Sequence, residues 1–183
     1  MQVSVEELKK FMEQAKSTSY IELRYHEKVL NEIRVSNGEL DRIRSVVNDG
    51  IGIRVLVSGC WGFSSTSEMS RESVMDTINN AISSAGLLAE SKQRKVEKLA
   101  EANLAVGTFK PPLNGNLTDY SIEEKIKLTI DSDALTKKYS NKIKATSCVY
   151  RETMDQKIIV NTDGASAELF NSKPEFSVTA VAK

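Results

Sequence analysis

The sequence contains one histidine, His26, and two cysteines, Cys60 and Cys148, among 183 residues. One histidine cannot supply the pair that a helical zinc-peptidase site needs, and neither cysteine belongs to a Cys-x-x-Cys motif. A Ser-His-Asp or Cys-His site would have to use this same histidine, and no Gly-x-Ser-x-Gly turn exposes a nucleophilic serine. We therefore expect no catalytic centre in this stretch of chain.

Charge of one sign is also lacking, because 25 basic residues balance 25 acidic ones. A neutral total gives no general attraction to nucleic acid. A local basic cluster exists, but glutamates are interleaved with it, which favours a solvated helix face over a nucleic-acid site. The cluster comprises Lys92, Arg94, Lys95 and Lys98. Gly50-Ile-Gly52 lacks the third glycine of a dinucleotide fingerprint and precedes a strand, so a phosphate-binding loop is not expected there.

Long apolar runs are absent, and no stretch approaches the roughly 18 residues of a membrane span. The first residues are acidic rather than basic, unlike those of a signal peptide. We expect a soluble cytoplasmic protein in which Cys60 and Cys148 are buried thiols and form no disulfide.

Helices are predicted where capping residues precede apolar positions at helical spacing. Ser4-Val-Glu-Glu7 and Ser121-Ile-Glu-Glu124 are capping boxes, and Ser70 is a further N-cap. The predicted helices run to about Lys16, from Ser70 to about Ala85, and from Ser121 to about Tyr139, and the polar segment 87–102 is also expected to be helical. Pro111-Pro112 marks a connection.

Strands are predicted from alternating and β-branched runs separated by turn residues. In the first half they are Tyr20–Glu27, Val29–Val35, Leu40–Val47, Ile51–Val57 and Cys60–Thr66. In the second half they are Lys142–Arg151, Lys157–Asn161, Ala165–Phe170 and Phe176–Ala182. Asn37-Gly38 and Ser58-Gly59 are expected to form two-residue hairpin turns.

The ribbon from Gly50 to Thr66 is the most unusual part of the chain, because it contains four glycines. Glycine within a strand marks a bulge or a place where another backbone comes close. Trp61 and Phe63 share one side of their strand; stacking on a ligand is possible chemistry for them, but packing in a core is the simpler interpretation.

These elements predict an α+β fold, with antiparallel or mixed sheets and helices packed on one face. Each half has a capped helix, an alternating strand and a glycine turn, which suggests internal duplication of a helix-plus-hairpins unit. The similar halves would be residues 1–86 and 120–183, joined by 87–119. By this comparison Phe176–Ala182 corresponds to the first arm of the Gly-rich ribbon, so we expect residues 1–183 to be one part of a larger protein.

The ordered set of segments resembles the N-terminal part of the TldD/PmbA family, which includes proteins described as modulators of DNA gyrase. The resemblance rests on Tyr20–Glu27, Asn37-Gly38-Glu39, Asn48–Val55, Trp61–Thr66, the Ser70 helix, Ser121–Lys125 and Val160–Gly164. It implies a cytoplasmic zinc metallopeptidase that acts on unfolded or short peptides and pairs with a TldD- or PmbA-type subunit. The run Gly50–Arg54 favours the TldD-like type.

The family's zinc motif, His-Glu-x-x-x-His, occurs nowhere in this sequence, so the resemblance assigns no catalytic or metal residue. It implies that zinc belongs to a C-terminal part and that this chain is a non-catalytic domain. Such a domain would pair subunits and help to wall a substrate channel, where an extended peptide can add to a sheet edge. The candidate contact residues are Gly50, Gly52, Arg54, Trp61, Gly62 and Phe63.

Two other functions are compatible with these residues. The chain could be a stand-alone binding or adaptor module without peptidase activity. Nucleic-acid binding is the other alternative and depends on the basic residues between Lys92 and Lys98.

Overall fold

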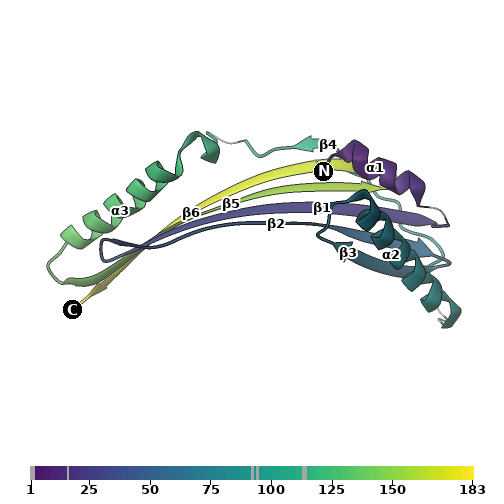
Figure 1. Ribbon diagram of the computed structural model, residues 1–183, viewed down its shortest axis with the longest axis horizontal. Helices are drawn as coiled ribbons and strands as arrows, with labels where there is room; N and C mark the ends of the chain where they lie inside the picture. Colours follow the sequence, from purple (N-terminus) through teal and green to yellow (C-terminus); the bar gives the residue numbers. More distant parts are fainter. Residues whose placement is uncertain (1–2, 16, 92, 94, 113–114) are drawn as a thin grey trace. The chain divides into compact units, whose positions relative to one another are not determined.

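The computed structural model describes residues 3–15, 17–91, 93, 95–112 and 115–183. These residues form three α-helices, a short 3-10 helix and six strands, and Figure 1 labels the α-helices and the strands. The helices are α1 (Val5–Gln14), α2 (Arg71–Ser91), η1 (Leu117–Asp119) and α3 (Ile122–Lys138). The strands are β1 (Tyr20–Ser36), β2 (Glu39–Val57), β3 (Cys60–Thr66), β4 (Val106–Phe109), β5 (Ile143–Asn161) and β6 (Ser166–Ala182).

The six strands form a mixed sheet in the order β3-β2-β1-β5-β6-β4. β2 and β3 are antiparallel, whereas β4 runs parallel to β6. The chain divides into two compact units, and strands from both halves of the sequence enter each of them. Unit 1 comprises Met1–Glu27, Asp49–Lys110 and Gln156–Phe170; unit 2 comprises Lys28–Asn48, Pro111–Asp155 and Asn171–Lys183.

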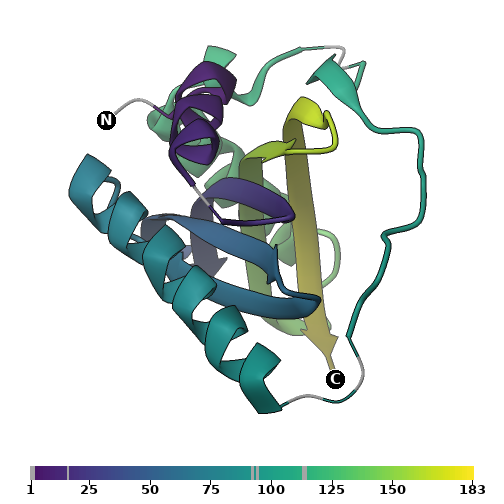
Figure 2. The same ribbon diagram turned by 90° about the vertical axis from the view of Figure 1, so that its right-hand side faces the viewer.

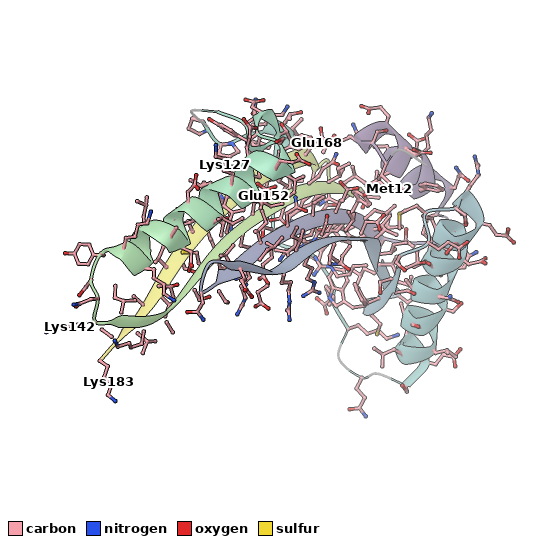
Figure 3. The ribbon with its side chains drawn as sticks, turned by 60° about the vertical axis from the view of Figure 1, so that its left-hand side comes forward. Met12, Lys127, Lys142, Glu152, Glu168 and Lys183 are labelled. Carbon is pink, nitrogen blue, oxygen red and sulfur yellow. The ribbon has the colours of Figure 1, made fainter. Side chains whose placement is uncertain are left out.

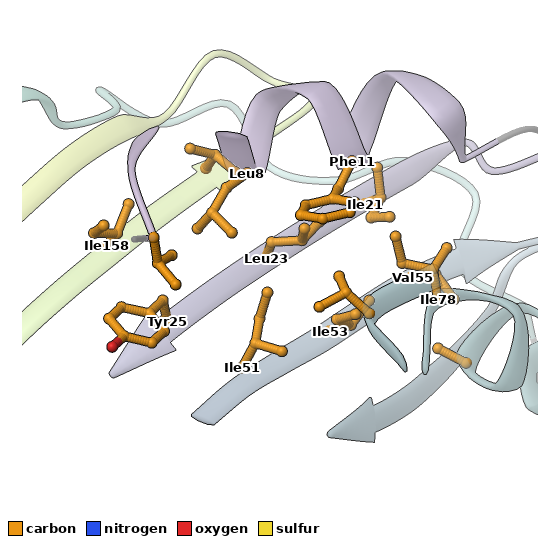
Figure 4. Packing of buried hydrophobic residues seen from close by; sticks show 14 of the residues in the cluster. Leu8, Phe11, Ile21, Leu23, Tyr25, Ile51, Ile53, Val55, Ile78 and Ile158 are labelled. Atoms are coloured by element: carbon orange, nitrogen blue, oxygen red, sulfur yellow. The ribbon is translucent and has the colours of Figure 1, made fainter. Parts of the chain in front are cut away.

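Unit 1 has the main hydrophobic core, which lies between the sheet and helices α1 and α2. Alternate residues of β1 and β2 point toward the helices because side chains in a strand change face at every residue. Figure 4 shows these residues meeting side chains from α1, α2 and β5. The core includes Leu8, Phe11, Ile21, Leu23, Tyr25, Ile51, Ile53, Val55, Ile78 and Ile158.

Helix α2 lies very close to β3, and glycine makes this approach possible. A Cβ atom at Gly62 would lie 2.0 Å from the carbonyl oxygen of Ala81 and 2.9 Å from the Cβ of Ala85. Figure 2 shows α2 lying along the β2–β3 hairpin. Small residues on both elements therefore determine how closely the helix packs on the sheet.

Unit 2 packs α3 against β5 and the β1–β2 hairpin through polar contacts. Lys125, Thr129 and Asp133 are the buried residues of this helix. Asp133 accepts a hydrogen bond of 2.6 Å from the backbone N–H of Gly38 in the hairpin turn. Ser121 and Glu124 form the predicted capping box in full. At the start of α1, Ser4 accepts from the amide of Glu7, which is one of the two bonds of the box predicted there.

The predicted α+β class is confirmed, and within each unit the helices pack on one face of the sheet. The predicted strand breaks are wrong, because β1, β2, β5 and β6 each run through a break without interruption. Lys28 lies inside β1, and Asn48-Asp-Gly50 lie inside β2 despite the preference of these three residues for turns. Pairing with a neighbouring strand overrides such preferences; for the part of β2 before Ile51, where β3 does not pair with it, that neighbour is β1. Pro174 lies in a part of β6 whose outer side pairs with none of the described strands, so its missing N–H is tolerated there.

The predicted helix at 87–102 is wrong beyond Ser91, where α2 ends. The described residues 95–105 have no regular secondary structure. The backbone N–H of Val96 donates to the carbonyl of Gly59 at 2.8 Å, so a tertiary contact replaces a helical one. Lys92 and Arg94 lie outside the described residues, while Lys98 pairs with Glu101 at 3.1 Å.

Replacing Gly62 by alanine should destabilise the protein by about 2–4 kcal/mol, because the new methyl group overlaps the backbone of α2. Gly86→Ala is the matched control, since Gly86 lies in α2 with no atom near its would-be Cβ. That change should raise stability by about 0.5–1 kcal/mol. Urea unfolding of both variants tests this; equal effects would show that α2 does not approach Gly62 closely.

Candidate functional site

The face of the unit 1 sheet opposite α1 and α2 has a group of interacting polar and aromatic side chains, which we call the Glu22 cluster. Its β1 residues alternate with Ile21 and Leu23 of the core, so they point to the other face. Arg54 lies between Ile53 and Val55 in the same way. The cluster comprises Tyr20, Glu22, Arg24, Arg54, Trp61 and Asn161.

Glu22 is the centre of this cluster and is almost fully buried. The hydroxyl of Tyr20 donates to its Oε2 at 2.9 Å, and Arg24 Nε donates to its Oε1 at 2.7 Å. Arg54 Nη2 lies 3.4 Å from Oε1. Asn161 Nδ2 donates to the Tyr20 hydroxyl at 3.2 Å, which links β5 to β1.

Burial by itself raises the pKa of the Glu22 carboxyl. The hydrogen bonds from Arg24 and Tyr20 and the charges of Arg24 and Arg54 outweigh this, so that its pKa lies below the ordinary 4.5. Burial also raises the pKa of Tyr20, and the adjacent Glu22 carboxylate raises it further. Glu22 is therefore a charged hydrogen-bond acceptor at neutral pH, with its oxygens occupied by protein donors.

Aromatic contacts extend the cluster to the edge strand β3. The guanidinium of Arg54 lies 4.8 Å from the centroid of the Trp61 ring, within the range of a cation–π interaction. Tyr20 and Trp61 meet edge to face with their centroids 5.6 Å apart. Arg54 is thus held between a carboxylate and an indole ring.

The face with the Glu22 cluster brings together four of the six predicted contact residues, namely Gly52, Arg54, Trp61 and Phe63. Arg54 pairs with Phe63 across the β2–β3 ladder. The Phe63 ring lies over Gly52, 3.5 Å from the position of a Cβ there, and Phe63 is 66% exposed. Core packing was the interpretation favoured for Trp61 and Phe63, and for the exposed Phe63 it is wrong. Helix α2 packs on the face of β3 that contains Gly62, so Trp61 and Phe63 point to the other face, away from the core.

The other two predicted residues have different surroundings. Gly62 is buried against α2 on the helix-covered face. Gly50 lies beside the end of β3, where a Cβ would be 3.1 Å from the carbonyl oxygen of Thr66. Neither joins the Glu22 cluster.

The prediction of contact residues omitted Tyr20, Glu22, Arg24 and Asn161. The alternation of β1 does place Glu22 and Arg24 on the polar face, so the strand pattern contained part of the signal. The contact of Asn161 with Tyr20 spans 141 residues of sequence, and local patterns do not reveal such a contact.

Unit 2 contains several buried carboxylates, and the one with the most partners is Glu152, on the helix-covered face of β5 (Figure 3). Lys125 of α3 lies 3.1 and 3.0 Å from its two oxygens, and Asn31 donates to it at 2.9 Å. Burial alone raises its pKa, but hydrogen bonds from Tyr150, Asn31 and Lys125 lower it overall. These contacts connect α3 to the sheet.

Glu22 and Glu152 do not fit a metal site, because each is already surrounded by cations and hydrogen-bond donors. Among the described residues no three His, Cys, Asp or Glu side chains are grouped to hold a metal ion. Cys60 and Cys148 are free and buried, as expected. No described helix has the length and apolar character needed to cross a membrane.

Two family models match the chain. One, described as PmbA/TldA metallopeptidase domain 1, matches residues 21–85, and the other, the PmbA/TldA metallopeptidase central domain, matches residues 115–183. The chain belongs to the PmbA/TldD family. A metalloprotease from Methanocaldococcus jannaschii is 26% identical over 170 residues, which are 91% of this chain and 36% of that protein. The chain thus spans about a third of this relative.

Solved structures show the same fold. A proposed modulator of a DNA gyrase from Thermotoga maritima MSB8 superposes with a TM-score of 0.76 at 20% identity, covering 98% of this chain and 40% of that one. A similar protein from Bacteroides thetaiotaomicron VPI-5482 has a TM-score of 0.77 at 17% identity, with 97% and 41% covered. TldE from Thermococcus kodakarensis has a TM-score of 0.65 at 14% identity, with 99% and 43% covered.

Acidification should weaken the fold through Glu22. Because the pKa of its carboxyl is lower in the folded state, the contribution of Glu22 to the free energy of unfolding is present above pH 4.5. It is lost as the pH falls through the lowered value. Glu22→Gln should therefore have a shallower loss of stability on acidification, whereas Glu13→Gln, at an exposed site of α1, should behave as wild type.

Urea unfolding at neutral pH and at a series of acidic values measures the difference. If the Glu22→Gln curve stays parallel to that of wild type over the whole series, the carboxylate does not have the role assigned to it.

Proposed function

We propose that this chain is the non-catalytic, N-terminal scaffold of a PmbA/TldD-type metallopeptidase. The two family matches support this role, as does the lack of a metal-binding group among the described residues. The peptidase's zinc would then be held by a part of the protein that this chain does not span. The TldD-like subunit type, the cytoplasmic location and the duplication of 1–86 in 120–183 stay predictions.

We further propose that β3 is where unit 1 contacts an extended peptide or a partner subunit. The observation that carries this is the exposed Phe63 ring beside Arg54 and Trp61, on a strand at the end of the sheet. An exposed edge strand offers unpaired backbone groups to an added strand, and neighbouring side chains then provide selectivity.

The β2–β3 register indicates which backbone groups are available. Val57 and Cys60 flank the two-residue turn and form a hydrogen-bonded pair, and such pairs alternate along an antiparallel ladder. Trp61, Phe63 and Ser65 consequently direct their N–H and C=O groups away from β2. These are the groups that an added peptide strand would use.

The scaffold role predicts that the purified chain does not hydrolyse peptides with or without added zinc. No three metal-binding side chains are grouped among the described residues to activate a water molecule. Fluorogenic peptides and an unfolded protein are suitable substrates, and metal analysis after dialysis should find far less than one zinc per chain. Turnover that survives purification and stops on chelation would refute the scaffold role.

Docking at the β3 edge predicts that Ser65→Pro weakens binding of an extended, unstructured peptide. Proline removes one outward N–H, worth about 1 kcal/mol or about fivefold in affinity, and keeps the bonds to β2. Ser65→Ala retains the N–H and should bind as wild type. Fluorescence anisotropy measures the affinities, and circular dichroism checks the fold; equal affinities for both variants would place the contact elsewhere.

A further inference from the structure

Helix α2 covers one face of β3, the strand at one end of the sheet. At one end of this contact the hydroxyl oxygens of Thr66 and Ser73 lie 3.1 Å apart. Further along the strand, Gly62 lies against Ala81 and Ala85, which a Cβ at that position would overlap. None of the described strands lies beyond β3 in the sheet order. The helix thus lies directly over the end strand, as Figure 2 shows.

A strand added to β3 would lie partly under this helix. Neighbouring strands in a sheet are about 4.8 Å apart. A helix with its side chains is about 10–12 Å wide, so α2 extends about 5–6 Å to each side of its axis. The contact at Gly62 is too close for even one methyl group, so little height remains beneath the helix. An added residue opposite Gly62 therefore has room for a small side chain only.

The outer flank of α2 supports the same conclusion, because its side chains are short and polar. Met75 and Ile82 pack against the core and so identify the inner flank. At 3.6 residues per turn, Ser73, Thr77 and Ser84 fall on the opposite flank, which faces the open edge of β3. These surroundings suit glycine, alanine or serine better than a large apolar residue.

The other face of the same edge is open and aromatic. Phe63 is 66% exposed, and Trp61 lies on the same face of β3. Contacts with Arg54 and Tyr20 fix the Trp61 ring, so this apolar surface is already formed. Aromatic side chains make favourable cross-strand pairs with aromatic and β-branched residues. An added residue opposite Phe63 is therefore favoured when it is large and apolar.

The two restrictions apply to alternate residues of an added strand, because side chains in a strand change face at every residue. A residue opposite Phe63 lies on the open face, and its neighbours, opposite Gly62 and Ser64, lie on the α2 face. We propose that the β3 edge selects extended segments in which small residues alternate with large apolar or aromatic ones, with the small residues under α2. This selectivity rests on the proposed peptide contact at β3 and names the class of peptide that fits it.

Two peptide isomers test the selectivity. Each contains three alanines and three tyrosines between terminal lysines; the residues alternate in one isomer, and the alanines precede the tyrosines in the other. The alternating isomer should bind the purified chain about tenfold more tightly, because the block isomer places at least one tyrosine on the α2 face in either phase. Fluorescence anisotropy measures both affinities, and the equal composition and charge of the isomers control for non-specific binding.

Ser65→Pro distinguishes this selectivity from the edge contact on which it rests. If the isomers bind wild type equally and Ser65→Pro weakens both, the edge contact stands and the selectivity is overturned. If neither isomer binds, or if Ser65→Pro changes neither affinity, both the edge contact and the selectivity are overturned.

Phe63→Ala tests which face takes the large residues. It should reduce the preference for the alternating isomer by about threefold, since the open face then lacks the ring. Phe109→Ala is the matched control, because Phe109 is a 44% exposed residue of β4, and this variant should keep the wild-type preference. A preference that Phe63→Ala leaves unchanged would overturn the assignment of large residues to the open face.

Discussion

Each unit covers its sheet with helices on one face, so the strands must stabilise the other face with their own side chains. In unit 1 the Glu22 cluster does this. A buried carboxylate there is surrounded by a tyrosine, two arginines and the tryptophan that Arg54 contacts. Removing water from a carboxylate is costly unless charged donors replace that water. The composition of this face follows from that requirement.

The two units use a related arrangement in different surroundings. In both, a glutamate on a long strand accepts a hydrogen bond from the tyrosine two residues before it, as in Tyr20–Glu22 and Tyr150–Glu152. In unit 2 the pair lies under α3 and Lys125 neutralises it, whereas in unit 1 it lies on the helix-free face beside arginines. The same local pair thus stabilises a helix contact in one place and a surface in the other.

Local signals in the sequence predicted the local features well. The capping box at Ser121 and the turns at Asn37-Gly38 and Ser58-Gly59 depend on neighbouring residues, and they form as predicted. Strand lengths were mispredicted because pairing of β2 with β1 keeps Asn48-Asp-Gly50 extended. The alternation of side chains along β3 identified its two faces, but only the position of α2 on the Gly62 face decides that Phe63 lies outside the core. The Glu22 cluster depends on Asn161, which no local pattern associates with Tyr20.

The Ser58-Gly59 turn shows how separate parts of unit 1 depend on one another. Both residues have positive φ, at 48° and 75°. A Cβ on Gly59 would also lie 2.6 Å from the Cβ of Lys95 and 2.9 Å from the carbonyl of Val96. At position 58 the choice of residue is limited by the positive φ. At position 59 it is limited both by the positive φ and by the segment at Lys95 and Val96, which leaves no room for a side chain. A redesigned hairpin loop here would have to be built together with residues 95–96, as one module made of two stretches of chain.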